Sequence, residues 1–145
     1  MPTILGDTYP ISYPNVPAGM SSQDNLIWAR FRPTVQTRFE VFYANVRVGS
    51  GQPALPGTDP ASAALLQTLT QHRIDIILAG PGLLWLMEVR NNAGSGALGT
   101  ILTNSSLYEQ DPLLGRDYTR VILTNDVDPD SRRAIELAGV QLIVV

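Results

Sequence analysis

Two acidic residues near the middle of the chain, Asp75 and Glu88, are the side chains whose type and spacing best suit catalysis. They belong to two apolar segments, 73–79 and 84–90, and the Gly-Pro-Gly-Leu sequence at 80–83 between them suits a type II turn. A turn centred there predicts a β-hairpin in which Asp75 lies opposite Glu88 on one face. Two carboxylates in that position can bind Mg²⁺ and lower the pKa of its bound water.

Two arginines fall on the same face of the predicted hairpin and offer a second interpretation of the carboxylates. The register pairs Arg73 with Arg90 beside Asp75 and Glu88, so the four charges sum to zero without a metal ion. Guanidinium groups are permanently charged and bind carboxylates well. The sequence therefore favours a structural ion cluster of Arg73, Asp75, Glu88 and Arg90, and a metal site at Asp75 and Glu88 is the alternative.

The composition excludes several classes of function. The 145 residues include no cysteine and one histidine, and all ten basic residues are arginine. Disulfides, thiolate nucleophiles, zinc–cysteine sites, lysine Schiff bases and P-loops are therefore impossible. The net charge is −3 and the arginines are scattered, so we expect DNA binding to be weak or absent. The uninterrupted apolar stretches are too short to cross a bilayer, and we expect no membrane association.

Helix and strand signals alternate from residue 23 onward, which predicts one α/β domain over 23–145 with a mixed sheet flanked by helices. Ser21 indicates one helix start. Asp59 and Asp128 indicate two others, because a proline follows each of these two aspartates. We expect helices over 21–32, 59–72, 97–110 and 128–138, and strands over 38–48, 73–79, 84–90, 118–123 and 140–145.

The first 22 residues differ from the rest because they contain four prolines, at positions 2, 10, 14 and 17. This composition favours an extended arm over a helix or a sheet. We expect the arm to contact other proteins or a second copy of the chain, with Tyr9, Tyr13 and Trp28 as interface residues. A core position is the alternative for Trp28.

The hairpin and the segments after it resemble the PD-(D/E)xK nuclease superfamily. Asp75, twelve intervening residues and then Glu88-Val89-Arg90 resemble the motif of that family. Ala97-Leu98-Gly99-Thr100-Ile101-Leu102 and the later Tyr108 resemble its downstream helix, and the resemblance covers residues 39–145. It implies a restriction-endonuclease-like core, in which two carboxylates hold Mg²⁺ and a lysine two residues after the second acid orients the attacking water.

The departures from the family pattern affect the groups that would carry catalysis. Arg90 stands in place of the motif lysine, and the sequence contains no lysine that could take over its role. Thr100 stands in place of the helix glutamine, and the first helix lacks the acidic residue that some family members add to the metal site. These departures imply a degenerate member, in which Asp75, Glu88 and Arg90 are vestigial catalytic residues.

Sequences with an Arg-Ile-Asp strand, an Ala-Leu-Gly helix and a late Asp-Pro-Asp are similar to small proteins encoded by tailed bacteriophages. The resemblance implies a non-catalytic assembly protein of the virion, at the neck or tail, which binds other virion proteins and no cofactor. It would occur in the virion, and in the host cytoplasm during assembly. The alternative is a Mg²⁺-dependent DNA endonuclease that uses Asp75 and Glu88, with Arg90 stabilising the charge that develops on the phosphate.

Overall fold

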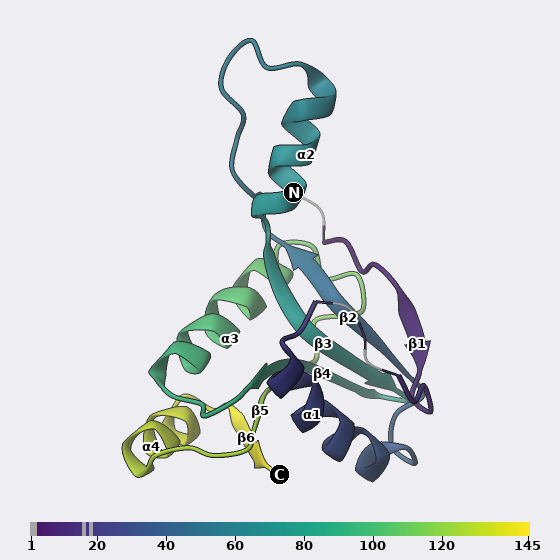
Figure 1. Ribbon diagram of the computed structural model, residues 1–145, viewed down its shortest axis with the longest axis vertical. Coiled ribbons are helices and arrows are strands. Elements are labelled where there is room, and N and C mark those ends of the chain that lie inside the picture. Colours follow the sequence, from purple (N-terminus) through teal and green to yellow (C-terminus); the bar gives the residue numbers. More distant parts are fainter. Residues whose placement is uncertain (1–2, 16, 18) are drawn as a thin grey trace.

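A computed structural model of the chain describes residues 3–15, 17 and 19–145. It contains one six-stranded sheet in the spatial order β1-β2-β3-β4-β5-β6, with helices on both faces (Figure 1). The strands are β1 (Thr8–Pro10), β2 (Val41–Val48), β3 (His72–Gly80), β4 (Leu83–Arg90), β5 (Thr119–Thr124) and β6 (Gln141–Val144). The helices are α1 (Ser22–Phe31), the 3-10 helix η1 (Arg32–Val35), α2 (Pro60–Thr70), α3 (Ser95–Tyr108) and α4 (Pro129–Leu137).

Three of the helices begin at the caps that the sequence indicates. The side chains of Ser21, Asp59 and Asp128 each accept a hydrogen bond from the backbone N–H three residues later. Such caps satisfy N–H groups that have no partner within the helix. The predicted starts of α1, α2 and α4 are therefore confirmed.

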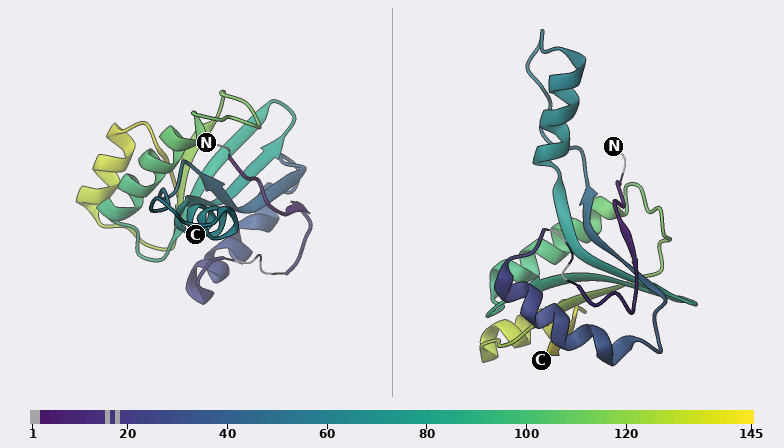
Figure 2. Two further views of the ribbon diagram at one scale, coloured as in Figure 1. Left: turned by 90° about the horizontal axis from the view of Figure 1, so that it is seen from above. Right: turned by 45° about the vertical axis from the view of Figure 1, so that its right-hand side comes forward.

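The sheet is mixed, as the sequence predicts. Strands β1 to β4 pair in antiparallel fashion, and β4, β5 and β6 pair in parallel through crossovers that contain α3 and α4. Figure 2 shows α1 on one side of the sheet and α3 with α4 on the other. The predicted mixed α/β architecture is confirmed.

Both faces of the central hairpin are buried. The α1-side core includes Trp28, Phe42, Trp85 and Met87. The α3-side core includes Ile77, Leu86, Ile101, Tyr108 and Ile122. Charged residues on β3 and β4 are therefore confined to the end of the hairpin furthest from its turn.

The N-terminal segment is extended, but its described part lies in the sheet. Strand β1 pairs with β2, and Ile4 exchanges backbone hydrogen bonds with Arg47. Ile11 is buried in the α1-side core. This part of the segment therefore belongs to the domain that the sequence predicts to begin at residue 23. Met1, Pro2, Val16 and Ala18, which the predicted arm includes, lie outside the described residues.

The three predicted interface residues pack within the chain. The Trp28 side chain is only 2% exposed, and its ring meets Phe42 edge-on at 5.0 Å between centroids. Tyr9 and Tyr13 are half-buried, lie 4.6 Å apart and also contact Phe42. Trp28 is therefore a core residue, because a side chain with so little exposed area has nothing left to offer a partner.

Helix α2 projects away from the rest of the molecule (Figures 1 and 2). It contains no buried residue, and Leu65 and Leu69 are 59% and 60% exposed. Asp59 is the one charged residue in the sequence from 49 to 71. The projection therefore presents a partly apolar surface with a single charged side chain. Among the described residues, no helix has the length and apolar character required to span a bilayer.

Candidate functional site

Strands β3 and β4 separate at the level of the two predicted carboxylates. The predicted hairpin register is confirmed from Gly80–Leu83 to Ile76–Met87, where the β3–β4 pairing ends, and Asp75 and Glu88 are the next residues along the two strands. Beyond this point β3 stays paired with β2, and β4 stays paired with β5. The hairpin thus opens into a fork, with Asp75 and Glu88 at its base.

Asp75 holds the fork together through its side chain. Its Oδ2 atom accepts a hydrogen bond of 2.9 Å from the backbone N–H of Val89. That N–H belongs to the edge of β4 that the departing β3 leaves without a ladder partner. The Asp75 carboxylate is therefore directed from β3 towards β4, beside Glu88.

Glu88 is held by the arginine that follows it on β4. The Nε and Nη2 atoms of Arg90 donate to Glu88 Oε1 at 3.2 and 2.9 Å, and Nη2 also donates to Thr100 Oγ1 on α3 at 3.4 Å. Glu88 is 5% exposed, whereas the Arg90 side chain is partly open to solvent. Arg90 therefore fixes the orientation of a buried carboxylate and ties it to α3.

The first turn of α1 brings an acidic residue, Asp24, to the fork. The backbone N–H of Asn91 donates to Asp24 Oδ1 at 2.9 Å, and Asn91 Nδ2 donates to Gln23 Oε1 at 2.9 Å. These bonds join the start of α1 to the end of β4. The sequence analysis did not identify Asp24 as part of the site.

The electrostatics of the fork favour protonation of the acid pair. Burial, followed by the charge of Glu88, raises the pKa of Asp75 to about 7. Burial also raises the pKa of Glu88, although hydrogen bonds from Arg90 and Asp75 counteract this effect. The negative charge of Asp24 raises both pKa values further. The pair therefore carries more negative charge than its surroundings stabilise.

Arg73 lies elsewhere, which corrects the predicted four-residue ion cluster. In register it faces Arg47 on β2 instead of Arg90 on β4. Among the described residues, the ion pairs are Arg90–Glu88 and Arg132–Glu136. Since Arg73 does not pair with either acid, Asp24, Asp75 and Glu88 share one neighbouring arginine, and the cluster is not neutral when all three acids are ionised.

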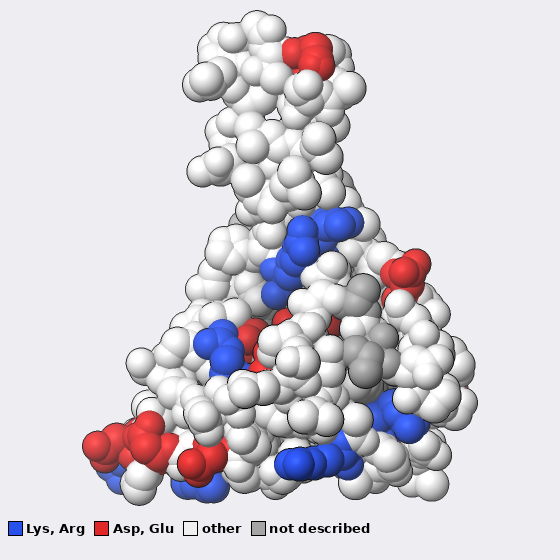
Figure 3. Space-filling view, in the orientation of Figure 1, with Lys and Arg blue, Asp and Glu red and all other residues white. Residues whose placement is uncertain are grey.

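The donor set of the fork suits a hard cation that keeps most of its water. In the described part of the chain, no group of three or more acidic or histidine side chains could hold a metal ion, so Asp24 is a neighbour of the site and not a third ligand. Mg²⁺ commonly binds one or two carboxylates and completes its shell with water and substrate phosphate. Asp75 and Glu88 fit that pattern. Figure 3 shows acidic atoms recessed on the α1 side of the molecule, with basic atoms beside and above them.

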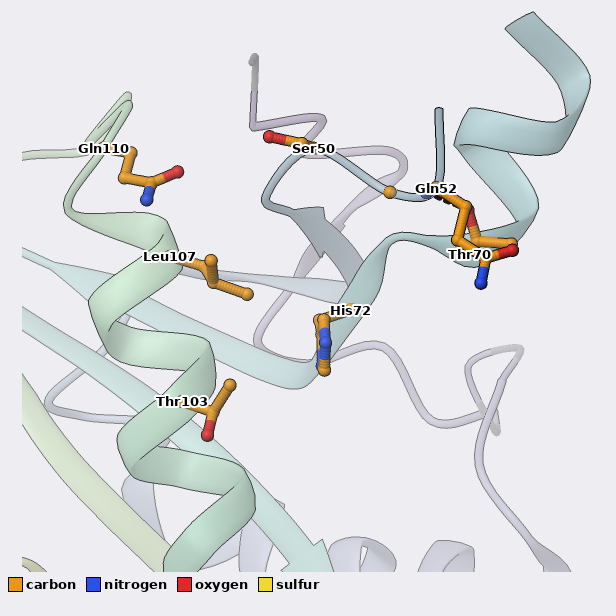
Figure 4. Close-up of a pocket in the computed structure, with 8 residues that line it drawn as sticks. Ser50, Gln52, Thr70, His72, Thr103, Leu107 and Gln110 are labelled. Carbon is orange, nitrogen blue, oxygen red and sulfur yellow. Dashed lines mark hydrogen bonds between the residues drawn. The ribbon is translucent and has the colours of Figure 1, made fainter. Parts of the chain in front are cut away.

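A hollow of about 660 Å³ is separate from the fork. It lies between the base of α2, the start of β3 and α3. His72 and Thr103 point into it from β3 and α3 (Figure 4), and Thr70 Oγ1 accepts a 2.6 Å hydrogen bond from Gln52 N. Its lining has no acidic residue and no arginine. The hollow therefore lacks the carboxylates of a Mg²⁺ site and the guanidinium groups that bind phosphate most strongly.

Comparison with known proteins supports the fold alone. No protein-family model matches the chain, and no curated protein matches it. A solved structure does match: a repair endonuclease from Pyrococcus abyssi, with a TM-score of 0.50 and 12% sequence identity over 90% of this chain and 49% of that one. The chain thus spans about half the length of that protein. The predicted restriction-endonuclease-like α+β fold is confirmed by this similarity.

Proposed function

We propose that the protein is a Mg²⁺-dependent DNA endonuclease in which Asp75 and Glu88 hold the metal ion. The observation that carries the proposal is the acid pair of half-buried Asp75 and buried Glu88 at the base of the β3–β4 fork, whose pKa values are raised by burial and by neighbouring negative charge. A bound divalent cation would supply compensating positive charge. The similarity in fold to a repair endonuclease also supports the proposal.

Each residue of the fork has a separate task in this proposal. Mg²⁺, when bound, would supply a water of lowered pKa and would neutralise charge on the phosphate. Asp75 is positioned by the Val89 N–H and Glu88 by Arg90, so the two ligands are oriented before the cation binds. Asp24 joins α1 to the end of β4 and adds negative potential that attracts a cation.

Arg90 acts as a positioning residue, which differs from the role that a lysine would have there. Two of its nitrogen atoms are committed to Glu88 and one of these also reaches Thr100. A guanidinium group does not give up its proton near neutral pH, so it cannot serve as a base. Its contribution is to hold Glu88 and to add one positive charge beside the phosphate.

Variants of Arg90 separate the effect of its charge from that of its hydrogen bonds. We expect Arg90→Lys to keep the cleavage rate within about tenfold of wild type, because a charge beside Glu88 remains. We expect Arg90→Met to lose about 10- to 100-fold, the usual effect of removing a group that orients a metal ligand. Cleavage rates at saturating Mg²⁺ measure both. A methionine variant that cleaves as fast as the wild type would contradict the positioning role.

The proposal is tested by incubating supercoiled plasmid with the purified protein in Mg²⁺, in Mn²⁺ and in EDTA. We expect nicked or linear plasmid in either metal and none in EDTA. Absence of cleavage by folded wild-type protein in both metals would refute the endonuclease proposal.

We propose, as a second candidate, an assembly role in the virion of a tailed bacteriophage, at the neck or tail. The observation that favours it is the α2 projection, which has no buried residue and exposes Leu55, Leu65 and Leu69. Exposed apolar surface of this kind marks contacts between proteins. In this role the protein would be present stoichiometrically in purified particles.

Leucine variants of the projection test the assembly role. We expect Leu65→Gln with Leu69→Gln to leave the stability of the isolated domain within about 0.5 kcal/mol, because both side chains are exposed. The same variant would reduce incorporation into particles about tenfold or more. The double variant Asp75→Asn with Glu88→Gln serves as the control and should be incorporated normally. Normal incorporation of the leucine variant would contradict the assembly role.

A further inference from the structure

Two arginines that are far apart in the sequence lie opposite each other on the neighbouring strands β2 and β3. Arg47 is the basic residue of β2 and Arg73 is the basic residue of β3, and their Cα atoms are partners in the register. Side chains directly opposite each other in an antiparallel pair lie close together, and like charges there repel. The molecule therefore concentrates positive charge at one point of the sheet.

Both arginines lie on the α1 side of the sheet, where Asp24 also lies. Val46 and Ile74, their neighbours in sequence, belong to the α3-side core, so alternation places the arginines on the opposite face. This arrangement depends on Asn45, whose φ of 56° changes the face on which successive residues of β2 appear. On the face shown in Figure 3, a basic surface lies below the α2 projection and above the recessed acidic atoms.

Nothing in the described part of the chain neutralises this pair. Neither side chain takes part in an ion pair there, and the Nε atom of Arg47 is buried without a hydrogen-bond partner. Asp7 lines the same 220 Å³ hollow as Arg47 but forms no ion pair with it. A buried donor without a partner is costly and uncommon, which points to an acceptor that the described residues do not supply.

We infer that Arg47 and Arg73 form a phosphate-binding site that holds the backbone of a nucleic acid strand next to the acid pair. This inference rests on the proposed nuclease function, because Arg73 lies only two residues before Asp75 on β3. Guanidinium groups suit phosphate oxygens through paired hydrogen bonds. A strand held there would pass over the fork, where Asp75 and Glu88 lie. The arginines would then bring a phosphodiester into a region that the net charge of −3 would otherwise repel.

The site is tested by binding measured in EDTA, where cleavage does not occur. The probe is a short fluorescein-labelled DNA duplex, followed by the corresponding single strand, and affinity is measured by fluorescence anisotropy over a range of salt concentrations. We expect Arg47→Gln with Arg73→Gln to weaken binding about 10- to 100-fold. The slope of log K against log salt should fall by about 2, close to 0.9 for each lost phosphate contact.

Matched variants control for net charge and for folding. Arg132→Gln with Arg133→Gln removes the same charge from α4, at the other end of the molecule, and should leave the affinity within about threefold of wild type (Figure 1). Arg47→Lys with Arg73→Lys keeps the charge and should retain most of the affinity. Thermal unfolding of each variant verifies that it is folded.

Four results would overturn the inference. The first is that the wild-type protein binds neither DNA probe, and the second is that the glutamine variant of Arg47 and Arg73 binds DNA as tightly as the wild type. The third is that the α4 variant loses as much affinity as that glutamine variant. The fourth is that inorganic phosphate displaces the DNA at concentrations that match the affinity of phosphate for the protein. The last would identify a site for a small anion. If wild type binds DNA through these arginines but never cleaves it, the phosphate site stands and the endonuclease proposal fails.

Discussion

Replacing Asp75 by asparagine is expected to slow plasmid cleavage about a thousandfold and, at about pH 8, to stabilise the folded protein. The loss follows because a metal ligand contributes several kcal/mol to transition-state stabilisation, and about 4 kcal/mol corresponds to a thousandfold in rate. Asparagine can still accept the hydrogen bond from Val89 N–H, so the fork should remain intact. The stability gain follows because the variant no longer carries a half-buried carboxylate whose charge is disfavoured by burial and by Glu88.

The pH dependence of this effect has a definite sign. The pKa of Asp75 is about 7 in the folded protein, compared with an ordinary value of 3.8, so the folded state binds the proton more tightly. The free energy of unfolding therefore falls as the pH rises from about 4 to about 7, by at most about 1.4 kcal/mol per pH unit. Asp75→Asn removes this contribution, and the raised pKa of Glu88 leaves a smaller slope of the same sign.

Urea unfolding at several pH values between about 4 and 8 measures this slope. Asp117, which is exposed, provides the control, since Asp117→Asn should change neither cleavage nor the slope. A wild-type protein whose stability rises over this range, or an Asp75→Asn variant with the wild-type slope, would contradict the raised pKa. An Asp75→Asn variant that cleaves plasmid at the wild-type rate would separate Asp75 from catalysis.

Replacing Trp28 by alanine is expected to reduce the free energy of unfolding by about 3–5 kcal/mol. Trp28 is 2% exposed and packs against Phe31 and Phe42 beneath β2, so the change would leave a large cavity in the α1-side core. Chemical denaturation measures the loss. Leu65→Ala, at a side chain that is 59% exposed, should change stability by less than about 0.5 kcal/mol. A Trp28→Ala variant with nearly wild-type stability would contradict the core position of Trp28 and would favour an interface role.

The sequence predicts the elements of this fold because their signals are local. Cap residues lie immediately before α1, α2 and α4, and the turn at 80–83 sets the register of the hairpin. Each depends on residues a few positions apart. The predicted opposition of Asp75 and Glu88 follows from that register, and for this reason the core of the candidate site is visible in the sequence.

The surroundings of the site were not predictable because they depend on where paired strands separate. The hairpin register, extended to its open end, places Arg73 opposite Arg90, but β3 leaves β4 after Ile76 and keeps Arg73 beside Arg47. Hydrophobic alternation gives no signal for such a separation. Asp24 was missed for a similar reason, since its contact with Asn91 joins residues 67 positions apart.

The N-terminal segment illustrates the same limit. Its prolines correctly indicate extended backbone, but extended backbone serves equally for a free arm and for an edge strand. The structure pairs Thr8–Pro10 with β2, and Pro10 is tolerated because the other side of β1 carries no neighbouring strand. Composition therefore predicted the conformation of this segment, while its position depended on a long-range pairing with β2.

Isothermal titration of Mn²⁺ into the wild-type protein and into Asp75→Asn, at about pH 7.5, tests the central claim most directly, because the claim is that the acid pair holds a divalent cation. We expect about one Mn²⁺ per wild-type chain, with a heat that varies with the buffer because binding displaces protons from a site of raised pKa. The Asp75→Asn variant should bind at least about tenfold more weakly. Wild-type protein that binds no Mn²⁺, or a variant that binds it equally well, would contradict the account.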